Sequence, residues 1–374
     1  KYKDFLMIGY EFHEFSNDDV EVLKKDWEYV RSLCADVVSH HSGTKNKKWK
    51  DAVKQEYIDV HGQLRRVLSY IDLAPKFPPR FRLKKTVVSS MIASHFGYEL
   101  EQLPGRYVAI SDIDLKCREL TKQYAGQTIR QLMTCFNLEL LTDGVLSMKS
   151  IAEKIVIAMF GGTAKRLNQI ELFEKFGLVG KTIVFTSNGG RTEDMKLYHM
   201  DFSELTRETV VDDKGIERPI TFEDSDMYSY FSEHELLCIM FEENPADAKR
   251  ECKSNAMLSN TFKGFKRIVF SDEFIHTKVR RLWEDTRDKV MNQRLIDVIQ
   301  KRKDGSNVIL KNGEISTAPN FLKASENDVF LRGSGKDASL KHKTECVNGI
   351  CMLPQYVWIR GVSVIEELNR TPEI

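Results

Sequence analysis

One stretch of the chain decides the fold. It reads SIAEKIVIAMF (150–160), GGTA (161–164), KRLNQIELFEKFG (165–177) and LVGKTIVF (178–185). The pattern predicts a helix over 151–160, a Gly-rich break, a charged connector, and a β-branched strand over 178–185. Lys181 is the one charged residue of that strand. A lysine at this position either points outward from the sheet or has a role in a site, and the stretch alone leaves both readings open.

Working outward, the bulk composition favours a chain of two domains. The chain has 374 residues, of which 41% are hydrophobic, and a net charge of +1. This length is sufficient for two cores. Charge is unevenly distributed: Lys and Arg dominate residues 44–85, whereas acids outnumber bases over residues 191–243. A basic region beside an acidic one is compatible with a nucleic-acid surface on one part only, although a solvated charged face would give the same pattern.

The cysteines and the apolar runs restrict the class of protein. Seven cysteines are scattered along the chain, and the closest pair, Cys346 and Cys351, has no neighbours that would complete a zinc site. We therefore expect reduced thiols in a cytoplasmic protein. No run approaches the length of a membrane span and no signal peptide opens the sequence, so we expect no membrane partner.

Further elements follow from periodicity and punctuation. A strand is expected over 5–12, and Ser16 is expected to cap an amphipathic helix that contains Trp27. The region 39–50 is predicted to be a loop, and 53–71 fits either a helix or a strand. The tryptophans Trp27, Trp283 and Trp358 are expected in the core. The remaining predictions are short helices over 113–124 and 128–138, strands over 235–241, 263–270, 329–333 and 354–359, and helices over 87–96, 274–290 and 361–368.

Two matches in the same order indicate an internal repeat. VLKKDWEYVR (22–31) parallels KVRRLWEDTR (278–287), and PRFRLK (79–84) followed by VVSS (87–90) parallels PQYVWI (354–359) followed by VSVI (362–365). One such match could arise by chance, whereas two in order favour a duplication.

These segments resemble the MutH-like family of GATC-specific endonucleases, in the type II restriction enzyme branch that carries a second, catalytically silent copy of the domain. The resemblance implies an α/β (α+β) fold of two MutH-like, restriction-endonuclease-type domains with mixed central sheets flanked by helices, the first one incomplete. It assigns 1–99 to the later half of a first domain, 100–144 to a helical linker, and 145–374 to a second domain.

In that family an Asp, then Glu-x-Lys seven residues later, holds Mg²⁺ for phosphodiester hydrolysis. The matching lysine here is Lys181, but the carboxylate positions fall on Ile157, Leu172 and Val179, which offer no oxygen ligand. Glu171 and Glu174 lie near these positions in the sequence. The resemblance thus predicts no catalytic residue and no metal in this chain, with a Mg²⁺-dependent catalytic half located before Lys1.

Recognition of DNA can persist without cutting. By the resemblance, the residues expected to contact double-stranded DNA are Thr44, Lys45, Arg80, Arg82, Lys84, Lys85, Arg332 and Lys336. Arginine suits the guanine edge because its fork donates two hydrogen bonds, whereas Lys84 and Lys85 are expected to contact phosphates.

Three functions remain open. The first is sequence-specific recognition as part of a type II restriction endonuclease, with self-association or a catalytic domain as partner. The second is a non-catalytic DNA-binding or effector subunit that works with a separate nuclease. The third is a protein-interaction scaffold, which the acidic stretch 204–243 suggests.

Overall fold

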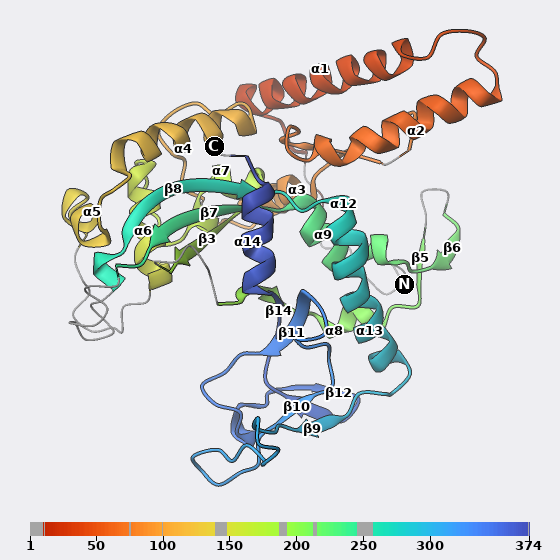
Figure 1. Ribbon diagram of the computed structural model, residues 1–374. Helices are drawn as coiled ribbons and strands as arrows, with labels where there is room; N and C mark the ends of the chain where they lie inside the picture. Colours follow the sequence, from red (N-terminus) through yellow and green to blue (C-terminus); the bar gives the residue numbers. More distant parts are fainter. Residues whose placement is uncertain are drawn as a thin grey trace. The chain divides into compact units, whose positions relative to one another are not determined.

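The computed structural model is a mixed α+β protein of helices and several small sheets (Figure 1). It describes residues 10, 12–74, 76–98, 100–138, 148–186, 193–211, 215–244, 257–372 and 374. The chain forms two compact units: unit 1 comprises residues 1–120 and 153–179, and unit 2 comprises residues 121–152 and 180–374. The chain passes between the units within α4 (Ile110–Tyr124), α6 (Met148–Met159) and β3 (Leu178–Phe185), so the units are defined by contacts in space and not by continuous stretches of sequence. The predicted repeat boundaries at 99 and 144 stay a prediction.

Unit 1 is built on a helical hairpin. Helix α1 (Asn17–Ser39) is capped by Ser16, as predicted. The Ser16 side chain accepts from the Asp19 amide, and the Asp19 side chain completes a capping box. Helix α2 (Lys47–Leu64) begins with Asn46 as its cap, so the predicted loop over 39–50 is shorter than expected. The two helices bury a shared core that contains Val30, Val53 and Tyr57. Elements β1 (Ile71–Leu73), β2 (Phe81–Leu83), α3 (Lys85–His95), α4 (Ile110–Tyr124), η2 (Leu167–Gln169) and α7 (Glu171–Lys175) complete this unit.

A buried carboxylate joins α1 to the start of β1. Asp26 is 4% exposed, and its oxygens accept from the amides of Ser69, Tyr70 and Ile71 at 2.7–3.1 Å. Burial raises the pKa of Asp26 above its ordinary value, while these amides and the nearby charge of Lys84 act in the opposite direction. The carboxylate thus satisfies three backbone donors that would otherwise be buried without partners.

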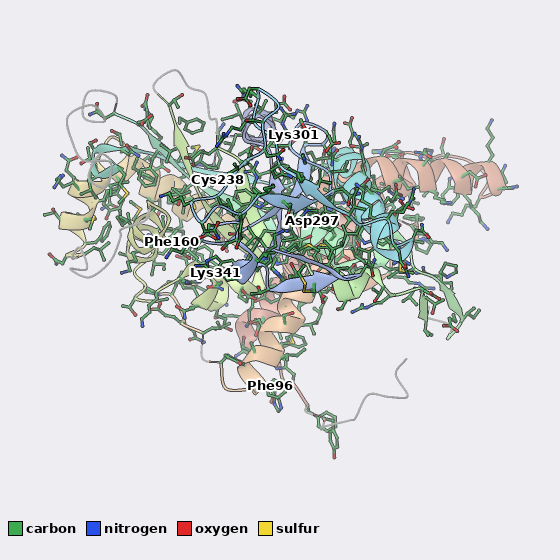
Figure 2. All side chains as sticks on the ribbon, turned by 90° about the horizontal axis from the view of Figure 1, so that it is seen from below. Phe96, Phe160, Cys238, Asp297, Lys301 and Lys341 are labelled. Carbon is green, nitrogen blue, oxygen red and sulfur yellow. A yellow bond between two sulfur atoms is a disulfide. The ribbon has the colours of Figure 1, made fainter. Side chains whose placement is uncertain are left out.

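Unit 2 contains two three-stranded sheets. In one, the order is β3–β7–β8, with β7 (Glu235–Glu242) and β8 (Thr261–Ile268) antiparallel and most of their residues buried. In the other, β14 (Gln355–Ile359) lies between β11 (Val329–Gly333) and β4 (Met195–His199). Figure 2 shows Cys238 of β7 inside the fold.

The other elements of unit 2 are helices and two-stranded sheets. They are α5 (Ile129–Cys135), α8 (Phe202–Leu205), β5 (Thr209–Val211), β6 (Glu217–Pro219), η3 (Phe222–Asp224), α9 (Asp226–Glu233), η4 (Met257–Ser259), α12 (Asp272–Phe274), η5 (Ile275–Val279), α13 (Arg280–Met291), β9 (Asp297–Ile299), β10 (Thr317–Pro319), η6 (Leu340–His342), β12 (Glu345–Val347), β13 (Ile350–Met352) and α14 (Gly361–Arg370). The segment η5 is a π-helix inside the helix predicted over 274–290.

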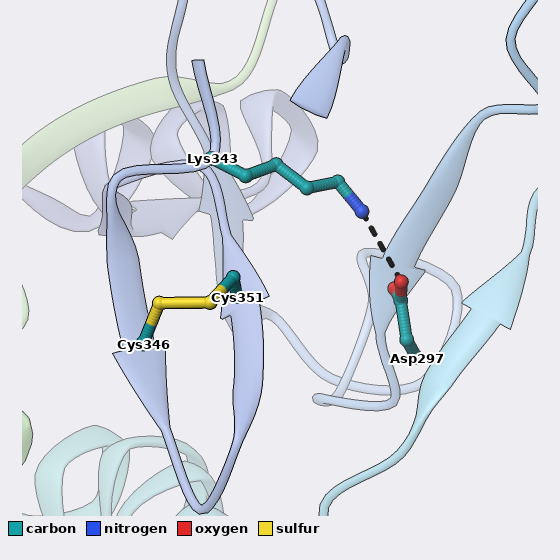
Figure 3. Close-up of a disulfide and its surroundings, with 4 residues drawn as sticks. All are labelled: Asp297, Lys343, Cys346 and Cys351. Carbon is teal, nitrogen blue, oxygen red and sulfur yellow. Dashed lines mark hydrogen bonds and ion pairs between the residues drawn. A yellow bond between two sulfur atoms is a disulfide. The ribbon is translucent and has the colours of Figure 1, made fainter. Parts of the chain in front are cut away.

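Two expectations about side chains are wrong. Trp27 is 47% exposed, because the neighbouring Asp26 takes the inward position on α1; Trp283 is buried as expected. Cys346 and Cys351 lie directly opposite each other in the β12–β13 hairpin and form a disulfide, whereas reduced thiols were expected (Figure 3). Next to this hairpin, Lys343 forms an ion pair with Asp297 at 3.2 Å.

Two further predicted segments cover residues 5–12 and 53–71. The strand predicted over 5–12 lies almost entirely outside the described residues. Residues 53–71, which fitted either a helix or a strand, form the greater part of α2 and reach the start of β1. No helix in the described part of the chain is long and apolar enough to cross a membrane.

Candidate nucleic-acid interface

The candidate site in unit 2 is one face of the β11–β14–β4 sheet. The antiparallel register sets Arg332 opposite Tyr356 and Phe330 opposite Trp358, and on the other side of β14 it sets Lys196 opposite Trp358. Because alternate side chains of a strand share a face, these cations and aromatic rings occupy the same side of the sheet. We refer to Lys196, Phe330, Arg332, Tyr356 and Trp358 as the cation–aromatic face.

Two cations stack on the rings of this face. The Arg332 guanidinium lies 4.8 Å from the ring centroid of Phe330 and 5.0 Å from that of Trp358. The Lys196 ammonium lies 3.3 Å from the ring centroid of Tyr356 and donates to the Ser334 hydroxyl at 2.9 Å. A cation over the face of an aromatic ring is stabilised by the negative potential of that face.

The Arg332 side chain is exposed, and a neighbouring carboxylate holds its guanidinium group. Its side chain is 46% exposed, and Nη2 donates to Asp194 Oδ2 at 2.7 Å. Its backbone oxygen accepts from the Trp358 indole at 3.2 Å. Lys336, four residues on, is exposed in the loop after β11. The family resemblance named Arg332 and Lys336, and both are exposed. It did not indicate the aromatic rings or Asp194, which hold the Arg332 side chain in position.

Lys181 has a structural role in this sheet region. The residue is 8% exposed, and its ammonium donates to the backbone oxygen of Lys196 in β4 at 2.8 Å. A lysine buried this deeply needs such an acceptor. The lysine that matches the family's catalytic position thus supports the strand that carries Lys196.

In unit 1, the predicted DNA-contacting residues separate into two groups. Arg80, Arg82 and Lys85 are exposed at the β2–α3 junction, and Arg82 pairs with Asp72 across the β1–β2 ladder at 2.5 Å. Thr44 and Lys45 are exposed before α2, with Lys45 over the Trp49 ring at 5.7 Å. The 18 residues of α2 span about 27 Å at 1.5 Å per residue. Thr44 and Lys45 precede its first residue, whereas the β1–β2 pair lies near its last turn, where the His61 ring is 2.8 Å from the Leu73 backbone oxygen. The two groups therefore lie towards opposite ends of α2.

Lys84 differs from its neighbours. It is 5% exposed, its ammonium donates to the backbone oxygen of Leu68 at 2.7 Å, and it lies near the Asp26 carboxylate. A buried lysine side chain cannot contact a DNA phosphate without breaking the interactions with its buried partners. The physical role that the structure supports for Lys84 is stabilisation of unit 1.

The positions that would ligate a metal do not fit one. Ile157 is 1% exposed among apolar neighbours, and Leu172 and Val179 likewise carry no oxygen. Near Leu172, the carboxylates of Asp19 and Glu171 both bind the Lys175 ammonium, at 2.9 and 2.6 Å. Burial raises the pKa of Asp19, but hydrogen bonds from Lys175, Ser16 and Tyr70 outweigh this effect and hold it below the ordinary value. Among the described residues, no group of three or more His, Cys, Asp or Glu side chains is arranged to hold a metal ion.

Comparison with known proteins gives one informative match. No family model matches the chain. The chain is 20% identical over 356 residues to the type II restriction enzyme Sau3AI of Staphylococcus aureus, and the alignment covers 91% of this chain and 66% of that enzyme. The chain therefore spans just under two thirds of the length of this relative. The similarity extends over most of the chain and supports a restriction-endonuclease-like family.

Proposed function

We propose that this chain recognises double-stranded DNA sequence-specifically as part of a type II restriction endonuclease of the MutH-like class, at a GATC-like site. Two observations support the proposal. The relative that aligns with 91% of the chain is a type II restriction enzyme, and Arg332 is exposed and aligned by stacking at the position that the sequence resemblance assigns to base reading.

The geometry at Arg332 carries the proposal. A guanidinium held against two neighbouring aromatic rings loses little further side-chain freedom when it binds, so more of the binding energy is retained. Its fork matches the O6 and N7 acceptors of guanine. Lys336 and the stacked Lys196 are suited to the adjacent phosphates, which contribute affinity without sequence information.

The residues of unit 1 would contribute a second DNA-contacting surface. Arg80, Arg82 and Lys85 are exposed at one junction, where Arg82 would exchange its Asp72 partner for a DNA acceptor. Thr44 and Lys45, which lie at the other end of α2, would contact the DNA backbone. Each of these contacts should make binding more sensitive to salt, because each phosphate contact releases condensed counterions.

Hydrolysis would belong to a catalytic half outside this chain. The carboxylate positions offer no oxygen ligand, so Mg²⁺ would be held by that half, whether fused to this chain or supplied as a separate nuclease. A protein with two copies of the MutH-like domain could also self-associate and thereby bring two DNA sites together.

A nuclease assay separates the possibilities. The 374-residue chain and the full-length gene product are incubated with a GATC-containing duplex and Mg²⁺. We expect cutting by the full-length product only, with binding but no cutting by the chain alone. If the full-length product binds but does not cut, the chain is a DNA-binding subunit that works with a separate nuclease. If neither protein binds DNA, the proposal is wrong and a protein-interaction scaffold becomes the better reading.

A further inference from the structure

Asp194 occupies the edge of the cation–aromatic face. It lies immediately before β4, and its two carboxylate oxygens have different partners. Oδ2 accepts from Arg332 at 2.7 Å, whereas Oδ1 accepts from the Gly361 amide at the first residue of α14, at 3.1 Å. One carboxylate therefore connects the exposed arginine to a helix start.

The α14 contact fixes the carboxylate. At Gly361, an added Cβ would come within 2.5 Å of the Glu193 backbone oxygen, so the helix start packs directly on the segment that carries Asp194. Asp194 itself is half-buried, with 20% of its side chain exposed, and Arg332 is the more exposed partner. The carboxylate is thus held in place whether or not Arg332 has another ligand.

We infer that Asp194 is a specificity-determining residue that directs Arg332 towards neutral base acceptors and away from phosphates. This inference rests on the proposed function. A guanine edge is uncharged, so Arg332 can bind it and keep Asp194. A phosphate bound to Arg332 would lie within a few ångströms of the fixed carboxylate, and like charges at that separation repel. The carboxylate therefore penalises the non-specific complex more than the specific one.

The test is Asp194→Asn in the 374-residue chain. Asparagine keeps an oxygen for the Gly361 amide and removes the negative charge beside Arg332. Asp288→Asn is the matched control, because Asp288 also pairs with an arginine, Arg294, and its substitution changes the net charge equally. Each protein is titrated with a GATC duplex and with a scrambled duplex of the same length, over a range of salt concentrations.

For the scrambled duplex, we expect Asp194→Asn to raise affinity about three- to tenfold and to steepen the salt dependence by about one phosphate contact. For the GATC duplex, we expect the affinity to change by less than about twofold. The preference for the GATC duplex over the scrambled duplex should therefore fall. Asp288→Asn should raise both affinities equally or leave both unchanged.

Two results would overturn the inference. The first is an unchanged affinity and salt slope for the scrambled duplex. The second is a loss of GATC affinity alone, which would make Asp194 only a support for Arg332. Wild-type binding without a GATC preference would count against the proposed recognition site, while the scrambled-duplex salt slope would still decide the role of Asp194. Absence of any DNA binding would overturn both proposals.

Discussion

Lys181 is the residue at which the resemblance to a nuclease and the structure lead to different roles. Its buried ammonium donates to the Lys196 backbone oxygen, so we expect a structural contribution and no part in phosphodiester cleavage. Lys181→Met should lower the free energy of unfolding by about 1–3 kcal/mol, because a buried acceptor loses its donor. Cleavage by the full-length product at saturating DNA should persist. Loss of cleavage by a variant of normal stability would contradict this assignment.

Glu204 should make the stability of unit 2 depend on pH. It is 3% exposed, and burial raises its pKa to about 7, with the nearby Asp226 carboxylate adding to the rise. Because the folded state binds this proton more tightly than the unfolded state does, the stabilisation is complete below about pH 4.5 and is lost as pH rises through 7. The loss is about 3 kcal/mol.

Glu204→Gln keeps an oxygen that can accept from the Asp226 amide but cannot ionise. Urea unfolding of this variant at pH 5, 6, 7 and 8 should show a flatter pH dependence than the wild type and greater stability at pH 8. Equal slopes for the two proteins over this range would show that Glu204 does not titrate as described.

At the scale of elements, α1 is tied to the β1 segment through Asp26. Asp26→Ala would leave the three amides of residues 69–71 without their buried acceptor and would remove the negative charge near the buried Lys84 ammonium. We expect a destabilisation of about 3–5 kcal/mol in urea unfolding followed by tryptophan fluorescence. Asp51→Ala, at an exposed position on α2, is the control and should change stability by less than about 0.5 kcal/mol. Similar effects of the two substitutions would argue against this anchor.

The elements with strong local signals could be predicted from sequence. Strand β3 has the predicted bounds of 178–185, because a β-branched run beginning after a glycine has few alternatives. The Ser16 cap follows from a serine that precedes a first turn with two acidic residues, Asp18 and Asp19. Lys84 and Trp27 could not be placed in the same way. The exposure of Trp27 and the burial of Lys84 both depend on the inward position of Asp26. Asp26 is distant in sequence from Lys84, and neither charge pattern nor helical periodicity reveals it.

The candidate site was predictable only in part, for a similar reason. The family resemblance named Arg332, at a strand end before a Gly-rich loop. Its fixed orientation depends on Trp358, which is brought alongside by strand register, and on Asp194, which precedes a different strand. The disulfide likewise depends on the pairing of two short strands that the sequence did not indicate.

At the scale of the whole molecule, the repeat has local counterparts in both units. Arg31 lies 5.3 Å from the Trp27 ring centroid and Arg287 lies 5.4 Å from that of Trp283. A single residue joins strand to helix at Lys84 and at Arg360, with similar backbone angles (φ −58°, ψ 145° and φ −59°, ψ 138°). Helical spacing alone brings residues four apart together, so the first likeness is weak evidence, and duplication stays a prediction.

The most direct test of the central proposal is the DNA affinity of the 374-residue chain, measured with a GATC duplex and a scrambled duplex at physiological salt. We predict tighter binding of the GATC duplex, and loss of about 1–3 kcal/mol of that preference in Arg332→Ala, with scrambled-duplex affinity little changed. Equal affinity of the wild-type chain for the two duplexes, or a preference that survives Arg332→Ala, would contradict the account.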